Sequence, residues 1–167
     1  MNSYSTVFAS VGAYEKGHIE IVDGKDKPMH YCFSNMFEVA DKSAPYEKVA
    51  VAKNERNLIE VIRAEGDSPW YAASHDEFVI AMDGEVEVHF VKLAAEDRLS
   101  KDKEGNVTLA GEPKGQNMGW LVLRRGHQAM LPADAAYQFR ARKESVLMQQ
   151  SLEGENTIYR WKDICLS

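Results

Sequence analysis

A histidine, two acidic residues and an Asp-Gly pair follow one another closely in the stretch WYAASHDEFVIAMDG, residues 70–84. Imidazole and carboxylate groups bind iron in mononuclear oxygenases, where roughly two histidines and one carboxylate share one face of the metal. The stretch could therefore supply the first half of a metal site. Whether a metal binds there decides whether this chain does chemistry itself or assists another chain.

Short β-strands are the elements that must position these side chains. The Asp83-Gly84 pair lies between two runs of β-formers, which predicts a hairpin. In the second run Val86, Val88 and Phe90 alternate with polar residues, as in a half-buried strand. No long amphipathic helix is evident, so the sequence predicts an all-β sandwich or barrel. Runs rich in β-formers occupy residues 30–40, 75–82, 85–93, 119–141 and 145–152.

The length of 167 residues and the hydrophobic content of 44% fit a single domain with its own core. We expect an N-terminal arm over about residues 1–45 and a barrel over about residues 46–160. Residues 94–118 are charged and glycine-rich, so we expect them to form a long exposed excursion. A loop of that length is usually functional, interfacial or mobile.

Composition argues against several classes of partner. The formal net charge is −6, and Arg124-Arg125 is too short a basic run to follow a nucleic-acid backbone. We expect no secretory signal and no membrane span, because no apolar run approaches the ~20 residues that cross a bilayer. The two cysteines, Cys32 and Cys165, show no CxxC spacing. They are interpreted as reduced thiols of a cytoplasmic protein.

Two spacings resemble those of the cupins, a superfamily of small jelly-roll β-barrels. The first cupin motif reads G-x5-H-x-H-x(3,4)-E-x6-G, and here Glu77 and Gly84 have its final spacing. The second reads G-x5-P-x-G-x2-H-x3-N, and Gly126 and Pro132 reproduce its start. Neither motif is specific alone, but both occur in order on a β-rich chain. The resemblance implies a cupin-type jelly-roll barrel with an N-terminal extension.

The metal-ligand positions of those motifs are largely lost. The two histidines of the first motif fall on Tyr71 and Ala73, and the histidine of the second falls on Tyr137. Only Glu77 remains, while Asp134 stands at a motif glycine. A tyrosine, with an ordinary pKa near ~10, is a poor ligand for a divalent ion at neutral pH. We expect both tyrosines to fill the barrel and to donate hydrogen bonds to Glu77.

Two histidines outside the motif positions could form a replacement metal site with Glu77. His75 and Glu77 lie two residues apart, so on a strand they share a face, and His127 could approach from the second motif. Structural roles for both histidines are favoured, because motif matches of this strength carry many false positives. Trp70 is a candidate pocket wall or partner contact, although a core aromatic is the simpler interpretation.

Four segments together give a closer resemblance: residues 43–54, 63–88, 122–139 and 161–166. They are similar to the small subunit of two-subunit hydroquinone 1,2-dioxygenases, and the length agrees. The resemblance implies a heterotetramer of two small and two large subunits. That enzyme uses Fe(II) and O2 to open the ring of hydroquinone, giving 4-hydroxymuconic semialdehyde. The large subunit's cupin domain holds the iron and the aromatic substrate, so the small subunit carries no catalytic residue and binds no metal.

Two rival functions remain open at the level of sequence. One is a stand-alone cupin oxygenase or isomerase with a non-standard metal site. The other is a metal-free cupin that binds a small molecule. The missing metal ligands argue against the stand-alone enzyme. They do not bear on the metal-free binding protein.

Overall fold

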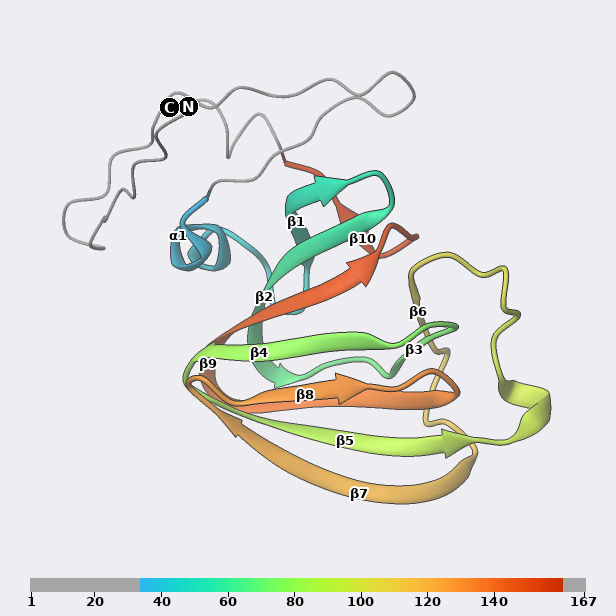
Figure 1. Ribbon diagram of the computed structural model, residues 1–167. Coiled ribbons are helices and arrows are strands. Elements are labelled where there is room, and N and C mark those ends of the chain that lie inside the picture. Colours follow the sequence, from blue (N-terminus) through green and yellow to red (C-terminus); the bar gives the residue numbers. More distant parts are fainter. Residues whose placement is uncertain (1–33, 161–167) are drawn as a thin grey trace, which may run out of the picture.

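The structure, a computed structural model, describes residues 34–160 of the chain (Figure 1). Cys32, Cys165 and most of the expected N-terminal arm lie outside the described residues. The elements in chain order are α1 (Met36–Asp41), β1 (Lys48–Asn54), β2 (Asn57–Asp67), β3 (Tyr71–Ala73), β4 (Glu77–Asp83), β5 (Glu85–Leu93), the short 3-10 helix η2 (Ala95–Asp97), β6 (Asn106–Thr108), β7 (Gly115–Arg124), β8 (Gln128–Leu131), β9 (Ala135–Leu152) and β10 (Thr157–Ile158).

Within residues 34–160 the strands form one ten-stranded sheet that curls into two facing layers. The long strand β9 bends and belongs to both layers. Its C-terminal half pairs with β2 and β4, and β1, β10 and β8 extend that layer. Its N-terminal half pairs with β3 and β5, and β6 and β7 form the edges of the second layer. The predicted all-β jelly-roll class is confirmed.

The predicted hairpin at Asp83-Gly84 is wrong, although the turn exists. β4 pairs with β8 and β9, whereas β5 pairs with β7 and β9, so the two strands do not pair with each other. Gly84 has a φ of +77°, and a methyl group there would come within 2.7 Å of Ser145 Cβ. Only glycine readily adopts this positive φ and also lacks the Cβ atom that would collide with Ser145. The pair forms the corner where the chain passes from one layer to the other, at the left of Figure 1.

A helix occupies part of the segment 30–40, where β-formers favoured a strand. Asn35 caps α1, because its side-chain oxygen accepts hydrogen bonds from the backbone N–H groups of Phe37 and Glu38 at 3.1 and 3.4 Å. Val39 and Ala40 are buried against β2 and β9. The cap and one buried face outweigh the weak strand propensity of so short a segment.

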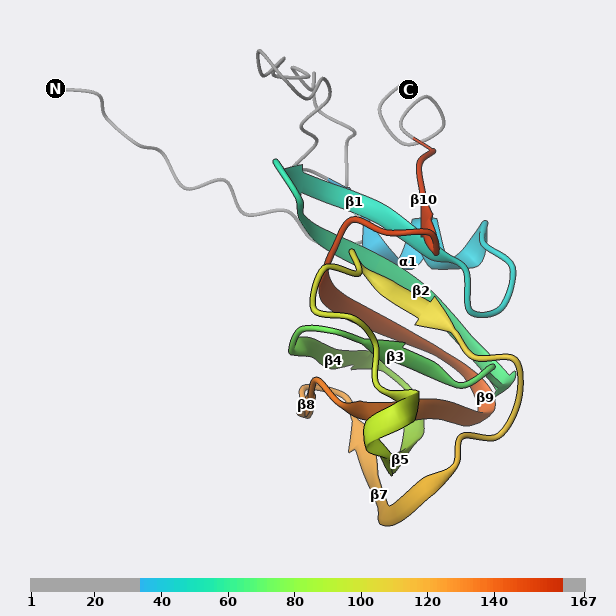
Figure 2. The same cartoon turned by 90° about the vertical axis from the view of Figure 1, so that its right-hand side faces the viewer.

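The segment 94–118, predicted as an exposed excursion, contains residues that belong to the sheet. Asn106–Thr108 forms β6, which pairs with β3, and Asn106 is buried. From Gly115 onward the chain already belongs to β7. A three-residue strand between charged flanks is too short to show a period of two. In Figure 2 the yellow-green segment between β5 and β7 lies on the side that faces the viewer.

The core fills the space between the two layers. The predicted alternation in β5 is confirmed, since Val86, Val88 and Phe90 are buried and their neighbours point outward. Tyr71 and Tyr137 belong to this core. The remaining members of the cluster are Tyr46, Ile62, Ala64, Val79, Ala81, Leu123, Ala129, Leu131, Phe139, Ala141 and Leu147.

Candidate functional site

The curl of the sheet brings the degenerate ligand positions together inside the barrel. Tyr71 on β3 and Tyr137 on β9 are register partners, with ring centres 5.7 Å apart. Ala73 lies two residues further along β3, on the same face as Tyr71, and Glu77 begins β4. Tyr71 and Ala73 are each 4% exposed, Tyr137 is 1% exposed and Glu77 is fully buried.

Glu77 is a buried carboxylate whose hydrogen bonds are satisfied. Tyr137 donates its hydroxyl hydrogen to Glu77 Oε2 at 2.6 Å. Asn106 and Ser151 donate to Oε1 at 2.7 and 2.5 Å. The predicted hydrogen bond to Glu77 is thus confirmed for Tyr137, whose pKa burial and the Glu77 charge raise well above its ordinary value. The Tyr71 hydroxyl makes no hydrogen bond within residues 34–160.

A lysine lies at the centre of this cluster. Lys48, the first residue of β1, is 2% exposed and donates from Nζ to the Tyr137 hydroxyl at 3.0 Å. Its Nζ also lies 4.1 Å from the centre of the Tyr71 ring, a cation–π geometry. Burial lowers the pKa of Lys48, while the charges of Glu77 and Glu60 oppose that effect. Sequence reasoning missed this role, because a lysine at a strand end is usually solvated.

A second buried acid faces the lysine. Glu60 on β2 is 1% exposed, and its Oε1 accepts a hydrogen bond from the Thr157 hydroxyl at 3.1 Å. Its other oxygen has no partner among the described residues. Burial raises the pKa of Glu60 to about 7, Lys48 lowers it and Glu77 raises it further. In sequence, Glu60 stands in the run NLIEVI, whose apolar surroundings were the only signal of its burial.

These groups do not make a metal site. No three His, Cys, Asp or Glu side chains among residues 34–160 are placed to hold a metal ion. The positions that would face a metal instead present two neutral phenols and a methyl group, and one ammonium group is already there. A divalent cation there would be repelled by Lys48, and the motif's ligand positions would offer it only Glu77 as a charged ligand. The cluster can, however, stabilise the barrel interior and present donors to its mouth.

The structure does not assemble the replacement site His75/Glu77/His127. Both ring nitrogens of His75 are buried and have no hydrogen-bond partner in the described part of the chain. The exposed His127 accepts a hydrogen bond at Nδ1 from the backbone N–H of Arg124 at 3.2 Å. Trp70 is partly buried and packs against a small apolar cluster at Ala72, Leu93 and Ala136.

The second motif retains its backbone conformation, although Tyr137 stands at the position of its metal-binding histidine. Gly126 has a φ of +83°, and Asp134, at the motif's glycine position, has a φ of +64°. Aspartate is one of the few residues other than glycine that adopts this conformation readily. The turn that leads β8 into β9 and points Tyr137 into the barrel is therefore retained.

Comparison with solved structures identifies the family. A chain of hydroquinone 1,2-dioxygenase PnpCD, solved with Cd2+ and 4-hydroxybenzonitrile, is 48% identical, covers 99% of this chain and 98% of that chain, and has a TM-score of 0.79. A chain of hydroquinone 1,2-dioxygenase from Sphingomonas sp. TTNP3 with 4-hydroxybenzoate bound is 47% identical, covers 99% of both chains and has a TM-score of 0.80. The chain belongs to the hydroquinone 1,2-dioxygenase family. The family predicted from the sequence is confirmed.

A second type of chain in the same enzymes shares only the fold. A chain of PnpCD in complex with Fe3+ is 15% identical with a TM-score of 0.55, and the match covers 84% of this chain but 38% of that one. A chain of the Sphingomonas sp. TTNP3 hydroquinone 1,2-dioxygenase with 4-nitrophenol is 16% identical with a TM-score of 0.54, covering 73% and 32%. No family model and no curated protein sequence matches. No helix within residues 34–160 is long and apolar enough to cross a membrane.

Proposed function

We propose that this chain is the small, non-iron subunit of a two-subunit hydroquinone 1,2-dioxygenase. A larger cupin-containing subunit holds Fe(II) and the aromatic substrate, in an α2β2 assembly in the cytoplasm. The observation that carries the proposal is the cluster at the ligand positions, where Tyr71, Tyr137 and Lys48 fill the space a metal would need. That cluster lies in a chain that matches PnpCD over 99% of its length.

The lengths of the matching chains support the small-subunit role. This chain covers 98% of one chain in a PnpCD structure but 38% of a chain in another PnpCD structure. One type of chain therefore has this length, and the other is much longer and contains a domain of the same fold. The resemblance at 47–48% identity is to the short type.

The donor set supports a metal site in the partner. PnpCD has been solved with Cd2+ and with Fe3+, so that enzyme takes a metal. In this chain the motif's ligand positions offer one carboxylate, Glu77, which is already engaged by three donors and lies beside a buried ammonium group. A stand-alone cupin oxygenase would need ligands that these positions lack.

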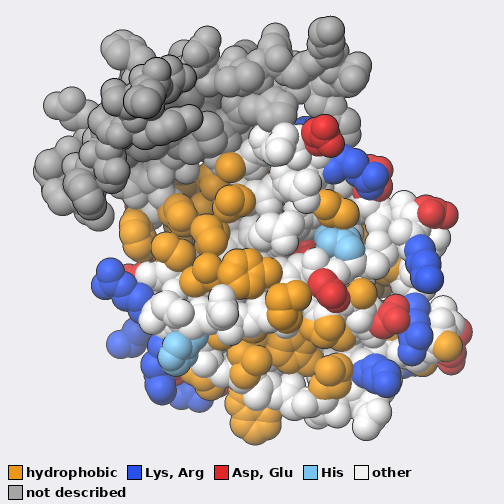
Figure 3. All heavy atoms as spheres, in the orientation of Figure 1, with side chains coloured by type: hydrophobic (Ala, Val, Ile, Leu, Met, Phe, Trp, Pro, Cys, Tyr) orange, Lys and Arg blue, Asp and Glu red, His pale blue; other side chains and the backbone are white. Residues whose placement is uncertain are grey.

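An apolar surface on an edge strand supports assembly with the larger chain. We define the β7 strip as Met118, Trp120 and Val122, which are 52%, 65% and 37% exposed. Within the described residues β7 pairs only with β5, so its outer edge is open. The Trp120 ring stacks on His89 at 6.0 Å between centres. Hydrophobic side chains gather over the lower part of Figure 3, where β5, β7 and β8 lie.

The larger chain is the occupant we propose for the β7 strip. Exposed tryptophan and methionine are typical of interface cores rather than of free surfaces. The family's enzyme has a second, longer type of chain, and that chain contains a domain of the same fold.

Co-expression with the larger subunit tests the proposal. We expect a complex in which iron follows the larger chain, while this chain purified alone holds no stoichiometric iron, zinc or manganese. Size-exclusion chromatography with light scattering gives the assembly, and metal analysis gives the ions per chain. Near-equimolar metal in this chain alone, lost in Glu77→Ala, would overturn the metal assignment. A stable monomer with no affinity for the larger chain would overturn the subunit role.

A further inference from the structure

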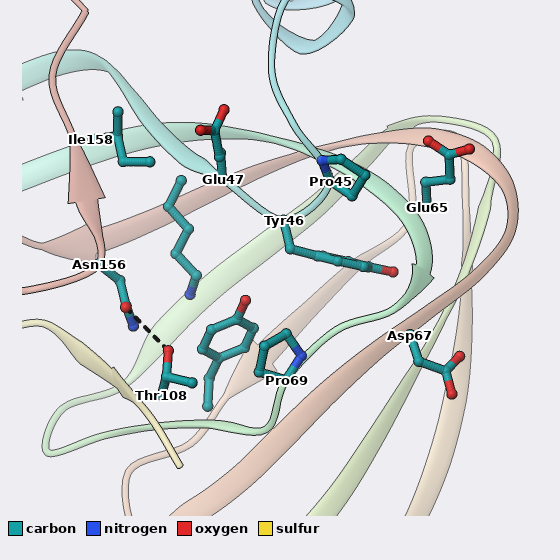
Figure 4. A pocket seen from close by; sticks show the side chains of 11 residues that line it. Pro45, Tyr46, Glu47, Glu65, Asp67, Pro69, Thr108, Asn156 and Ile158 are labelled. Carbon is teal, nitrogen blue, oxygen red and sulfur yellow. Dashed lines mark hydrogen bonds between the residues drawn. The ribbon is translucent and has the colours of Figure 1, made fainter. Parts of the chain in front are cut away.

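A pocket of about 440 Å³ opens at the mouth of the barrel, above the buried cluster (Figure 4). That volume lies within the range of pockets for small organic molecules. Most of its side walls are apolar, with Pro45, Tyr46 and Pro69 on one side in Figure 4 and Thr108, Asn156 and Ile158 on the other. The pocket connects the surface of the barrel with its buried polar cluster.

Lys48 brings a primary amine to the floor of this pocket. It lines the pocket although it is only 2% exposed, so the pocket is the route by which a molecule reaches the amine. Tyr71 lines the same floor, and the centre of its ring lies 4.1 Å from Lys48 Nζ. Burial and the charge of Glu60 raise the pKa of Tyr71 to about 12, so its hydroxyl keeps its hydrogen at neutral pH. A lysine amine and a proton donor therefore lie side by side.

Two buried carboxyl groups act on the Lys48 amine. Glu60 pairs with Ala50, two residues from Lys48, so the Glu60 and Lys48 side chains share one face of the sheet. The Tyr137 hydroxyl bonds both Lys48 and Glu77. Burial lowers the pKa of Lys48, while the charges of Glu77 and Glu60 oppose that effect. Any positive charge on Lys48 is therefore balanced by buried acids.

Glu60 is the base that this environment provides for the amine. Its Oε1 accepts a hydrogen bond from Thr157, and its Oε2 is buried and has no partner among the described residues. Burial raises the pKa of Glu60 to about 7, so it takes up and releases a proton near neutral pH. A proton that passes from Lys48 to Glu60 leaves a neutral amine beside a neutral carboxylic acid, while Glu77 keeps its three donors.

We propose that the Lys48 amine forms an imine with a small uncharged aldehyde that enters this pocket. Lysine amines removed from water are the nucleophiles of such reactions. The nitrogen lone pair attacks the carbonyl carbon, while the Tyr71 hydroxyl donates a hydrogen bond to the carbonyl oxygen. A proton moves from nitrogen to that oxygen, which gives a carbinolamine.

Loss of water completes the imine. Protonated Glu60 returns its proton to the carbinolamine hydroxyl, which leaves as water, and a C=N bond replaces the C=O bond. The resulting iminium carries the positive charge that the lysine ammonium carried before. Glu60 and Glu77 therefore balance the adduct as they balance the free lysine. The inference concerns this chain's own residues and does not rest on the proposed function.

The charges at the rim favour an uncharged aldehyde. Lys48 is the one basic residue among the described residues that line the pocket. An aldehyde that also carries a carboxylate therefore finds no cation on the walls. The acidic residues of the rim are already paired with arginines: Glu47 with Arg160, Glu65 with Arg63 and Asp67 with Arg140.

Reductive trapping with butanal tests the proposal on the purified full-length chain, in the assembly in which it is isolated. Sodium cyanoborohydride reduces the imine to a stable amine, and peptide mass spectrometry locates the butyl group. A lysine with an ordinary pKa of ~10.4 is a free amine in roughly 1 of 2,500 molecules at pH 7. We therefore expect Lys48 to be modified about 10-fold or more faster than the exposed Lys101. Glyoxylate, an anionic aldehyde, should not show this preference.

Variants relate the modification to the pocket, with Lys101 as the reference in every sample. Ile158→Trp fills the pocket without replacing a residue of the buried cluster, and it should slow modification of Lys48 about 10-fold or more. Met130→Trp adds the same ring at a position that is 57% exposed, and it should leave the rate unchanged. Tyr71→Phe keeps the ring beside Lys48 but removes the hydroxyl, so the rate should fall about 3- to 10-fold.

Two results would overturn the proposal. One is modification of Lys101 while Lys48 stays unmodified in the folded wild type, which would mean that Lys48 serves only as the counter-charge of Glu60 and Glu77. The other is modification of Lys48 at the wild-type rate in Ile158→Trp, which would mean that the aldehyde does not enter through the pocket.

Discussion

The Tyr137 hydroxyl lies 2.6 Å from Glu77 Oε2 and donates its hydrogen to that carboxylate. These two residues stand at two of the ligand positions of the cupin motifs, where both would face a cation. A phenolic hydrogen replaces the metal as the group that the carboxylate binds. Lys48, 3.0 Å from the same hydroxyl, supplies the positive charge. The charges of this barrel interior are therefore compensated without an ion.

Glu77→Gln should lower stability and leave turnover per iron unchanged in the complex with the larger subunit. The carboxylate accepts from three donors, and an amide nitrogen in its place would oppose at least one of them. Loss of a buried, charge-assisted hydrogen bond costs about 1–3 kcal/mol. Thermal denaturation and the initial rate per iron atom measure the two effects.

Asn106→Ala is the matched control, because it removes one donor to Glu77 at 2.7 Å and keeps the carboxylate. Asn106→Ala should also lower the stability of the protein, again without loss of turnover. A ~100-fold lower rate in Glu77→Gln, at unchanged iron content and assembly, is the size expected for a lost general acid or base. That result would mean that this chain takes part in catalysis.

The sequence predicted the fold class, the residues at the ligand positions and the hydrogen bond from Tyr137 to Glu77, but not the buried lysine beside them. Motif spacing locates Tyr71, Glu77 and Tyr137, because turns and strand lengths fix that spacing. Lys48 and Glu60 lie on strands outside both motifs, and only the curl of the sheet brings them to the centre. The Asp83-Gly84 corner was mistaken for a hairpin for the same reason, since strand pairing is decided by the whole sheet and not by the turn.

Rebuilding the histidines should not create an oxygenase. The triple variant Tyr71→His, Ala73→His and Tyr137→His restores the nominal ligands but removes two buried aromatic side chains, each worth ~3 kcal/mol or more. The Lys48 ammonium remains beside the new imidazoles and repels a divalent ion. We expect a destabilised protein with weak iron binding and no cleavage of hydroquinone without the larger subunit.

Adding Lys48→Met to that triple variant tests the electrostatic part of the argument. Removing the ammonium group should tighten Zn2+ or Fe(II) binding relative to the triple variant, as measured by metal titration. Equal affinities in the two variants would mean that packing and unaligned imidazoles, not the lysine charge, exclude the metal.

Trp120→Ser should weaken assembly with the larger subunit. Tryptophan anchors at interface centres commonly contribute about 2 kcal/mol or more, which corresponds to a roughly 30-fold higher Kd. Phe37→Ser, on α1 and 37% exposed, is the matched apolar control and should have little effect. Light scattering distinguishes the outcomes. Loss of a homodimer, with binding to the larger chain intact, would assign the β7 strip to a second copy of this chain.

Glu60→Gln should stabilise the protein most at alkaline pH. The pKa of Glu60 is about 7 in the fold, raised from an ordinary value of 4.5. As the pH rises from about 4.5 to about 7, the unfolded chain releases this proton before the folded chain does. The free energy of unfolding therefore falls across that window. Glutamine has no such proton, so the free energy of unfolding of the variant should not fall across this window. In the wild type the fall is on the order of 1–3 kcal/mol.

Thermal denaturation of wild type and Glu60→Gln at pH 5 and pH 8 measures the difference. The gain in melting temperature should be small at pH 5 and clearly larger at pH 8, because only the wild type carries the extra buried charge there. Glu96→Gln, on the exposed face of η2, controls for the change in net charge and should show no such difference between the two pH values. An equal effect of Glu60→Gln at pH 5 and pH 8 would mean that Glu60 keeps one protonation state throughout, paired permanently with Lys48.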